Sequence, residues 1–229
     1  MTLNLSSSAP HISPAATWER SSPGPSHDSL ILYKSENPPL EIGIRRWRTG
    51  QVSESFPLDE LRHIIAGAAV YRGESGEIIE VEPGTAIHFK QGWRGVAEIR
   101  EPLDAAYVRC QGGPAPLTPV LHNVLTAGPL KEWGTVSKPL EGVSQTAGIL
   151  LSREPDRRAE SGIWTCTPGL WRCELKSDEF CHFLEGRCTY VHESGEIIEI
   201  EPDTAAFFPQ DWKGVCTVHE TIKKVYMIR

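Results

Sequence analysis

The sequence predicts an all-β protein in which one unit occurs twice. Residues 43–110 align without a gap on residues 162–229 when the first segment is moved forward by 119 positions, from 43 to 162. The same shift superposes the heptapeptide ESGEIIE of residues 74–80 on the ESGEIIE of residues 193–199. Each copy consists of short β-favouring runs separated by turns that contain Gly or Pro, which is typical of a sandwich or barrel.

The expected elements follow in chain order. Residues 1–28 are rich in Ser and Pro and hold few large apolar groups, so we expect a flexible N-terminal arm. Residues 29–112 form the first expected barrel and residues 144–229 the second. Residues 113–143, rich in Gly and Pro, read as a connecting segment. The strands expected in the first copy span residues 30–35, 61–65, 68–72, 77–82, 85–90, 93–100 and 105–109.

Composition limits the function classes. The formal net charge of −7 provides no basic surface for a phosphate backbone, so nucleic acid is not an expected partner. No run approaches the roughly 18 apolar residues of a membrane span, and the N-terminus lacks the pattern of a secretory signal. We therefore expect a soluble, cytoplasmic protein. Its six cysteines are expected to be reduced thiols.

Both copies contain the same short motifs. A glutamate is followed by six residues and a glycine at Glu60–Gly67 and again at Glu179–Gly186. The second copy also contains Asp178-Glu179-Phe180, Leu184-Glu185-Gly186, a Pro209–Trp212 loop and Lys224-Val225-Tyr226. These motifs resemble the cupin superfamily, and within it the subfamily of (S)-ureidoglycine aminohydrolase and the ethanolamine-utilisation cupin. The resemblance implies two tandem cupin barrels of the double-stranded β-helix (jelly-roll) type, a bicupin.

The resemblance also defines where metal ligands stand. Metal-binding cupins place His-x-His shortly before the motif glutamate and another His late in the unit, a set that suits Mn, Fe, Ni or Zn. The two early positions hold Arg172 and Glu174 in the second copy, and Ser53 and Ser55 in the first. By analogy, the resemblance implies an ammonia-releasing, Mn-dependent hydrolase activity.

Strand alternation predicts which side chains share the interior of the second barrel with the motif glutamate. We expect Arg172, Glu174, Glu179, Cys181 and Phe183 on one side and Cys216 on a facing strand. Catalysis is assigned to Glu179 as a general base, with Arg172 and Glu174 beside it. The planar fork of Arg172 could hold a substrate carboxylate. The alternative is that Arg172 pairs internally with Glu174 or Glu179.

Further substrate contacts are expected from aromatic and thiol groups. These are Phe183, Trp212, Cys181 and Cys216, in addition to Arg172. No cofactor is expected, but Glu174, Glu179, Cys181 and Cys216 could together hold a divalent metal such as Zn or Mn. The alternatives are that the cysteines act as small buried hydrophobes and that Trp212 is a packing group at the rim.

The first copy is expected to serve as the structural partner. Its interior set by alternation is Ser53, Ser55, Glu60, Arg62 and Ile64, which offers fewer converging polar groups.

Three functions remain open from the sequence. The first is a bicupin that binds a small polar or carboxylate metabolite in the second barrel, with or without aminohydrolase-like or lyase-like turnover. The second is a non-catalytic binding or structural cupin that has lost the usual metal ligands. The third is a metalloenzyme with the Cys and Glu ligand set. A homodimer is expected, because paired barrels can cover exposed sheet edges.

Overall fold

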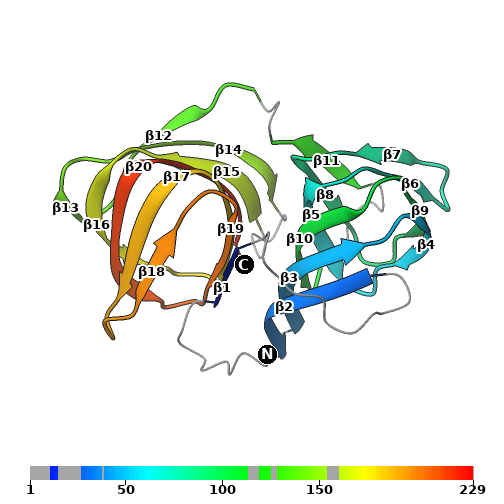
Figure 1. The fold of residues 1–229 in the computed structure, drawn as a ribbon, viewed down its shortest axis with the longest axis horizontal. Coiled ribbons are helices and arrows are strands. Elements are labelled where there is room, and N and C mark those ends of the chain that lie inside the picture. The colour runs from blue at the N-terminus through cyan, green and yellow to red at the C-terminus, as the bar shows by residue number, and fades with distance from the viewer. Residues whose placement is uncertain are drawn as a thin grey trace. The chain divides into compact units, whose positions relative to one another are not determined.

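The computed structural model describes residues 11–14, 27–37, 39–112, 119–124, 128–153 and 160–228. Every regular element in this part of the chain is a β-strand (Figure 1), and no helix in it could cross a membrane. The chain divides into two compact units, Trp18–Ala127 and Gly128–Arg229 together with Met1–Thr17. We call them the N-terminal barrel and the C-terminal barrel, because each curls its sheets around one core. The predicted all-β class with two tandem barrels is confirmed.

The N-terminal barrel is built from two facing sheets. Its strands are β2 (His27–Glu36), β3 (Pro39–Trp47), β4 (Gly50–Ser55), β5 (Asp59–Ala66), β6 (Ala69–Gly73), β7 (Ile78–Val81), β8 (Thr85–Phe89), β9 (Arg94–Ile99), β10 (Leu103–Cys110) and β11 (Val120–Asn123). One sheet has the order β11-β8-β5-β10-β3-β2 and the other β4-β9-β6-β7. Trp47, Phe56, Tyr71, Phe89 and Trp93 are fully buried among the core residues of this barrel.

The C-terminal barrel is one continuous curled sheet. Its strands are β1 (His11–Pro14), β12 (Lys131–Thr135), β13 (Pro139–Glu141), β14 (Gln145–Arg153), β15 (Glu160–Cys166), β16 (Gly169–Glu174), β17 (Glu179–His192), β18 (Ile197–Ile200), β19 (Thr204–Phe208) and β20 (Lys213–Ile228). The main order is β1-β19-β17-β20-β15-β14-β12. Strands β17 and β20 pair along almost their whole length, and together they carry most of the residues of the core.

The sequence repeat is also a structural repeat. The shift of 119 positions carries β4 onto β16, β7 onto β18 and β8 onto β19. Gly67 and Gly186 are equivalent, and both have a positive φ, of 83° and 80°. A Cβ atom at Gly67 would meet the carbonyl oxygen of Pro102, and one at Gly186 that of Thr221. The motif glycine is therefore required both by the left-handed backbone and by the close approach of a second strand.

Each barrel is flanked by one short additional strand in the same register. In the N-terminal barrel β11 pairs with β8, with Val120 opposite His88. In the C-terminal barrel β1 pairs with β19, with His11 opposite Phe207. Residues 88 and 207 are 119 positions apart, so β1 and β11 occupy equivalent places in the two barrels. Strand β1 comes from the arm that was expected over residues 1–28. Residues 1–10 and 15–26 of that arm lie outside the described residues.

The boundaries at residues 28, 112 and 143 stay predictions. Strand β2 begins at His27, and the connecting segment 113–143 contains β11, β12 and β13. Residues 113–118 and 125–127 within it lie outside the described part of the chain.

Candidate functional site

The candidate site is a cavity of about 420 Å³ inside the C-terminal barrel. Its walls come from strands β12 and β14–β17, from β19 and from the end of β20, so residues distant in sequence converge on it. The lining residues are Trp133, Thr135, Val136, Ser137, Thr146, Glu160, Trp164, Trp171, Cys173, Leu175, Glu179, Tyr190, Phe208, Lys224, Tyr226 and Ile228. An apolar, aromatic wall with a few charged groups is the usual composition of a small-molecule site.

A buried ion pair stands at the wall of this cavity. Lys224 Nζ donates to Glu179 Oε1 at 2.7 Å, and the two side chains are only 8% and 13% exposed. Cys181 Sγ lies 3.3 Å from the same oxygen. Burial lowers the pKa of Lys224, but Cys181 and Glu179 raise it more strongly, so that the net pKa lies above its usual value. The ammonium group therefore remains charged at neutral pH and neutralises Glu179.

A second carboxylate is held on the same side of the barrel. Tyr226 Oη donates to Glu160 Oε1 at 2.9 Å, and Arg153 Nε donates to Glu160 Oε2 at 2.6 Å. Burial is the main cause that raises the pKa of the Tyr226 hydroxyl, followed by its bond to Glu160, so Tyr226 remains a protonated donor. Glu160 and Tyr226 both line the cavity.

Aromatic rings surround the lysine. Its ammonium nitrogen lies 4.9 Å from the centre of the Trp164 ring and 5.7 Å from that of Phe183. Both distances are within the range of cation–π attraction. The positive charge of Lys224 is thus held by one carboxylate and two rings.

Three cysteines of this barrel are held as protonated thiols. Burial raises the pKa of Cys166 to about 11 and that of Cys173 to about 12. Burial, with Glu179 next, also raises the pKa of Cys181 far above its usual value. All three are free of disulfide bonds. Thiolates are the metal-binding and nucleophilic form of cysteine, so this environment disfavours both roles.

The prediction that Arg172 and Glu174 share the interior with Glu179 is wrong. Arg172 is exposed, and Glu174 binds Lys176 Nζ at 2.7 Å and Lys138 Nζ at 2.9 Å in a solvent-facing cluster. Cys173, between them, is the residue that lines the cavity. The physical reason is the loop of residues 175–178 between β16 and β17, across which strict alternation does not continue. Ser53 and Ser55 are exposed for the same reason.

Phe183, Cys181 and Cys216 are inside the barrel, as predicted, but they belong to its packed core. All three are completely buried, and none lines the cavity. Trp212 is also buried and packs against Phe208 and Tyr190, with ring centroids 5.4 Å and 5.8 Å apart. In the structure these four side chains pack in the core of the barrel. Whether they touch a substrate stays a prediction.

The residues present do not fit a metal centre. The set Glu174, Glu179, Cys181 and Cys216 is not brought together, because Glu174 lies on the outer face. Among the described residues no group of three or more His, Cys, Asp or Glu side chains is arranged to hold an ion. Within this set, burial raises the thiol pKa values of Cys181 and Cys216 well above the usual value, and the carboxylate of Glu179 is already paired with the Lys224 ammonium. The lysine supplies the positive charge that a metal would bring.

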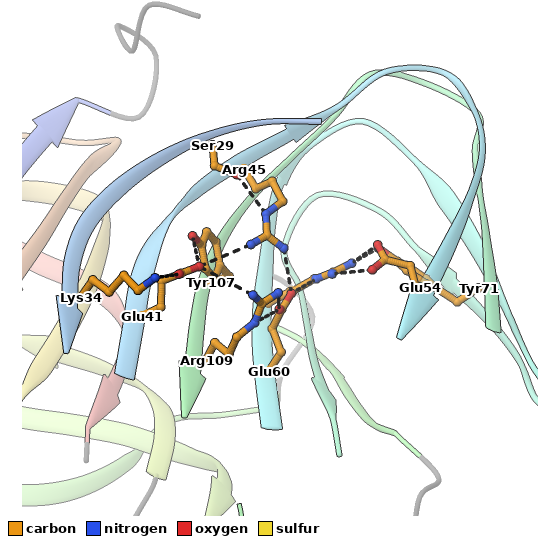
Figure 2. Close-up of polar contacts among 10 residues, drawn as sticks. Ser29, Lys34, Glu41, Arg45, Glu54, Glu60, Tyr71, Tyr107 and Arg109 are labelled. Carbon is orange, nitrogen blue, oxygen red and sulfur yellow. Dashed lines mark hydrogen bonds and ion pairs between the residues drawn. The ribbon is translucent and has the colours of Figure 1, made fainter. Parts of the chain in front are cut away.

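In the N-terminal barrel, buried arginine side chains occupy the equivalent place. Arg62 is fully buried, donates from Nε to Glu60 and binds Glu54 through Nη1 at 3.1 Å and Nη2 at 3.2 Å. Figure 2 shows how Arg45 and Arg109 converge on Glu60 from neighbouring strands. Three guanidinium groups thus share one buried carboxylate.

This network is strongly coupled electrostatically. Burial alone would raise the pKa of Glu60, but Arg62, Arg45 and Arg109 hold it at about 2, below the ordinary 4.5. The guanidinium carbon of Arg62 lies 4.5 Å from the Trp47 ring centre and 4.9 Å from that of Phe56. A charge placed in an apolar barrel is tolerated only with this many partners.

Of the residues that line the cavity, only Glu179 is among the candidates from the sequence. Those that it leaves out include Lys224, Glu160, Trp164 and Tyr226, although the motif Lys224-Val225-Tyr226 is part of the resemblance. The available signal was the alternation of β20, which places Lys224 and Tyr226 on the same inward face. Glu179 was predicted to be interior, and it does line the cavity.

Comparisons with known proteins agree with this architecture. Residues 153–226 match the family model described as the EutQ-like cupin domain. A protein of unknown function from Pseudomonas syringae pv. tomato has a similar structure, with a TM-score of 0.74 at 16% identity, covering 87% of this chain and 85% of that one. A Cupin 2 conserved barrel domain protein from Leptotrichia buccalis gives a TM-score of 0.67 at 11% identity, with 91% of both chains covered.

An oxalate decarboxylase variant from Bacillus subtilis is similar over 97% of this chain and 78% of its own, with a TM-score of 0.61 at 12% identity. Comparison with the curated proteins gives no match. At these identities the solved structures show the fold. The chain therefore has the cupin fold in two tandem barrels, and residues 153–226 of the second barrel are similar to the EutQ-like cupin domain.

Proposed function

We propose that this chain is a small-molecule-binding bicupin protein whose C-terminal barrel takes a small polar metabolite beside Glu179 and Lys224. The observation that carries the proposal is the contrast between equivalent interiors. Arg62 and its partners fill the N-terminal barrel, whereas the C-terminal barrel holds a cavity of about 420 Å³. That volume lies within the range of about 300–1,000 Å³ typical of metabolite sites.

Binding is better supported than metal-dependent turnover. Lys224, Glu179, Glu160 and Tyr226 present charged and hydrogen-bonding groups to the cavity, and aromatic rings offer apolar contact. An aminohydrolase-like or lyase-like reaction follows only from the resemblance, since the usual ligand positions hold other residues and the Cys and Glu set is not assembled. The non-catalytic binding cupin is therefore the function proposed. A cytoplasmic location and a homodimer are part of the same proposal.

The test is calorimetric titration of the full-length protein with a panel of small amines, amides, guanidines and carboxylates. We expect at least one class to bind with a one-to-one stoichiometry. The double variant Glu179→Gln/Lys224→Met, which removes both charges of the buried pair together, should abolish that binding. Arg172→Ala, on the outer face of the same barrel, is the matched control and should bind like the wild type.

Two further measurements separate the alternatives. Elemental analysis of protein purified without an affinity tag should give metal well below one equivalent per chain, whereas a stoichiometric metal lost in Cys181→Ala would restore the metalloenzyme hypothesis. Binding unaffected by the double variant would place the ligand outside the cavity and overturn the proposal. Light scattering tests the homodimer, which a monomeric mass would refute.

A further inference from the structure

In the N-terminal barrel the guanidinium group of Arg62 is surrounded by the rest of the barrel in the way that a bound ligand would be. This guanidinium is fully buried and donates to Glu60, to Glu54 and, at 3.0 Å, to the hydroxyl of Tyr71. It also lies against aromatic rings, with its carbon 4.9 Å from the centre of Phe56 and 5.3 Å from that of Phe89. Carboxylates at the edge and rings at the face are the surroundings that a planar cation prefers.

Three of these surrounding groups, a glutamate, a tyrosine and a phenylalanine, recur around the open cavity of the C-terminal barrel, while cysteine and leucine replace Glu54 and Phe56. The shift of 119 positions carries Glu54, Phe56, Glu60, Tyr71 and Phe89 onto Cys173, Leu175, Glu179, Tyr190 and Phe208, in that order. All five of the latter line the cavity. Arg62 itself is replaced by Cys181, whose short side chain stays in the core. The cavity therefore includes the place that the Arg62 guanidinium fills in the other barrel.

The other two arginines that bind Glu60 are also replaced. Arg45 corresponds to Trp164 and Arg109 to Ile228, and both replacements line the cavity. Among the residues that the structure describes, Lys224 is the only cation paired with Glu179, and it stands where the N-terminal barrel has Ala105. Glu179 has thus lost three guanidinium partners and gained one ammonium.

This exchange leaves one oxygen of Glu179 open. Both of its contacts, from Lys224 and from Cys181, go to Oε1. Oε2 has no hydrogen-bond partner among the residues that the structure describes. It is also not one of the fully buried polar atoms, and Glu179 lines the cavity, so a ligand there can reach it. In the N-terminal barrel the corresponding Oε2 of Glu60 accepts two N–H groups from Arg109.

We propose that the ligand of the C-terminal cavity is a small molecule that bears a guanidinium group. This inference rests on the proposed function. The guanidinium donates to Glu179 Oε2 and lies against Tyr190 and Phe208, as Arg62 lies against Tyr71 and Phe89. The rest of the molecule packs toward Trp133 and the other rings of the wall.

The presence of Lys224 does not oppose a second cation. Glu60 accommodates Arg45, Arg62 and Arg109 at once, so a carboxylate in this position tolerates several positive partners. A carboxylate ligand fits less well, because Lys224 is already paired and the other charged groups of the wall, Glu160 and Glu179, are acidic. A primary ammonium offers no planar fork for Glu179.

The experiment is a titration of the full-length protein with propylguanidinium chloride, with butylammonium chloride and sodium butyrate as matched probes. We expect saturable one-to-one binding of propylguanidinium and at least tenfold weaker binding of the other two. Glu179→Gln should weaken propylguanidinium binding roughly tenfold or more, since a charge-assisted bond is lost. Cys181→Arg should abolish it, because the introduced side chain fills the cavity from within. Arg172→Ala should bind normally.

The outcomes separate this inference from the proposed function. If propylguanidinium does not bind but an amide or a carboxylate of the panel does, and Cys181→Arg abolishes that binding, the cavity is a site and the guanidinium assignment is wrong. If no class of compound binds the wild type, the proposed function itself fails. If Cys181→Arg does not fold by circular dichroism, Glu179→Gln decides, and an unchanged affinity there overturns the inference.

Discussion

Replacement of Arg62 by methionine should cost the N-terminal barrel much of its stability. The side chain is fully buried, and it is the only partner of Glu54 and one of three cationic partners of Glu60 among the described residues. Breaking a buried ion pair by removing one member typically costs about 3–5 kcal/mol. Glu60 keeps Arg45 and Arg109, and Glu54 is 12% exposed and can gain water. We therefore expect a loss near the lower end, about 3 kcal/mol.

The assay is urea denaturation, with hydrogen exchange followed by mass spectrometry to locate the loss. Exchange should accelerate in β5 and β6, which carry Arg62 and Tyr71. The double variant Arg62→Met/Glu54→Gln should recover part of the loss, because it no longer leaves Glu54 as an uncompensated charge. Arg187→Ala is the matched control: its pair with Glu220 is more than half exposed at both ends, so no measurable change is expected. A loss below about 1 kcal/mol for Arg62→Met would refute the reasoning, since that is the range of exposed pairs.

Three further predictions follow from individual groups. The folded-state pKa of Glu60 is about 2, below its ordinary 4.5, so its contribution to the free energy of unfolding is complete above about pH 5 and is lost as pH falls toward 2. Measurement of the free energy of unfolding against pH should show this loss, and a Glu60→Gln variant that retains the full acid sensitivity would contradict it. Gly67→Ala should destabilise the protein by about 2 kcal/mol or more, because backbone strain at positive φ adds to the collision with Pro102. The control Gly76→Ala, where φ is also positive but nothing lies nearby, should lose only about 1 kcal/mol in the same denaturation assay. Equal losses would argue against the close approach at Gly67. N-ethylmaleimide at pH 8 should modify Cys166 and Cys173 slowly in the folded protein and quickly in urea, because their thiol pKa values in the folded protein are about 11 and 12. Rapid labelling of the folded protein, measured by mass spectrometry, would show that these thiols are not held protonated.

Much of the fold could be predicted because the repeat constrains it twice. The same turn signals occur 119 positions apart, so each expected strand in one copy supports its equivalent in the other. Gly67 and Gly186 illustrate this, since both copies need a left-handed residue at the same turn. The strand expected at residues 61–65 lies within β5, and the one expected at residues 68–72 coincides with β6 to within one residue at each end.

The candidate site could be predicted only in part, because alternation is a local rule. It holds within a strand, and it placed Glu179, Cys181 and Phe183 correctly on the inner face of β17. It fails across a loop, and so Arg172 and Glu174 were assigned to the wrong face of β16.

The open interior of the C-terminal barrel could not be predicted from either copy alone. It depends on the simultaneous replacement of Arg45, Arg62 and Arg109 on three different strands, which meet only in the folded barrel. Lys224 was overlooked because lysine is rarely buried without a partner, and its partner Glu179 lies 45 residues away in the sequence.

The central claim is that the C-terminal cavity includes the space which a guanidinium occupies in the N-terminal barrel. The most direct measurement is a crystal structure of the Cys181→Arg variant. We predict that the introduced guanidinium enters the cavity, donates to Glu179 and the hydroxyl of Tyr190, and lies against Phe208. A structure in which the cavity stays open and the new side chain lies elsewhere would contradict the account.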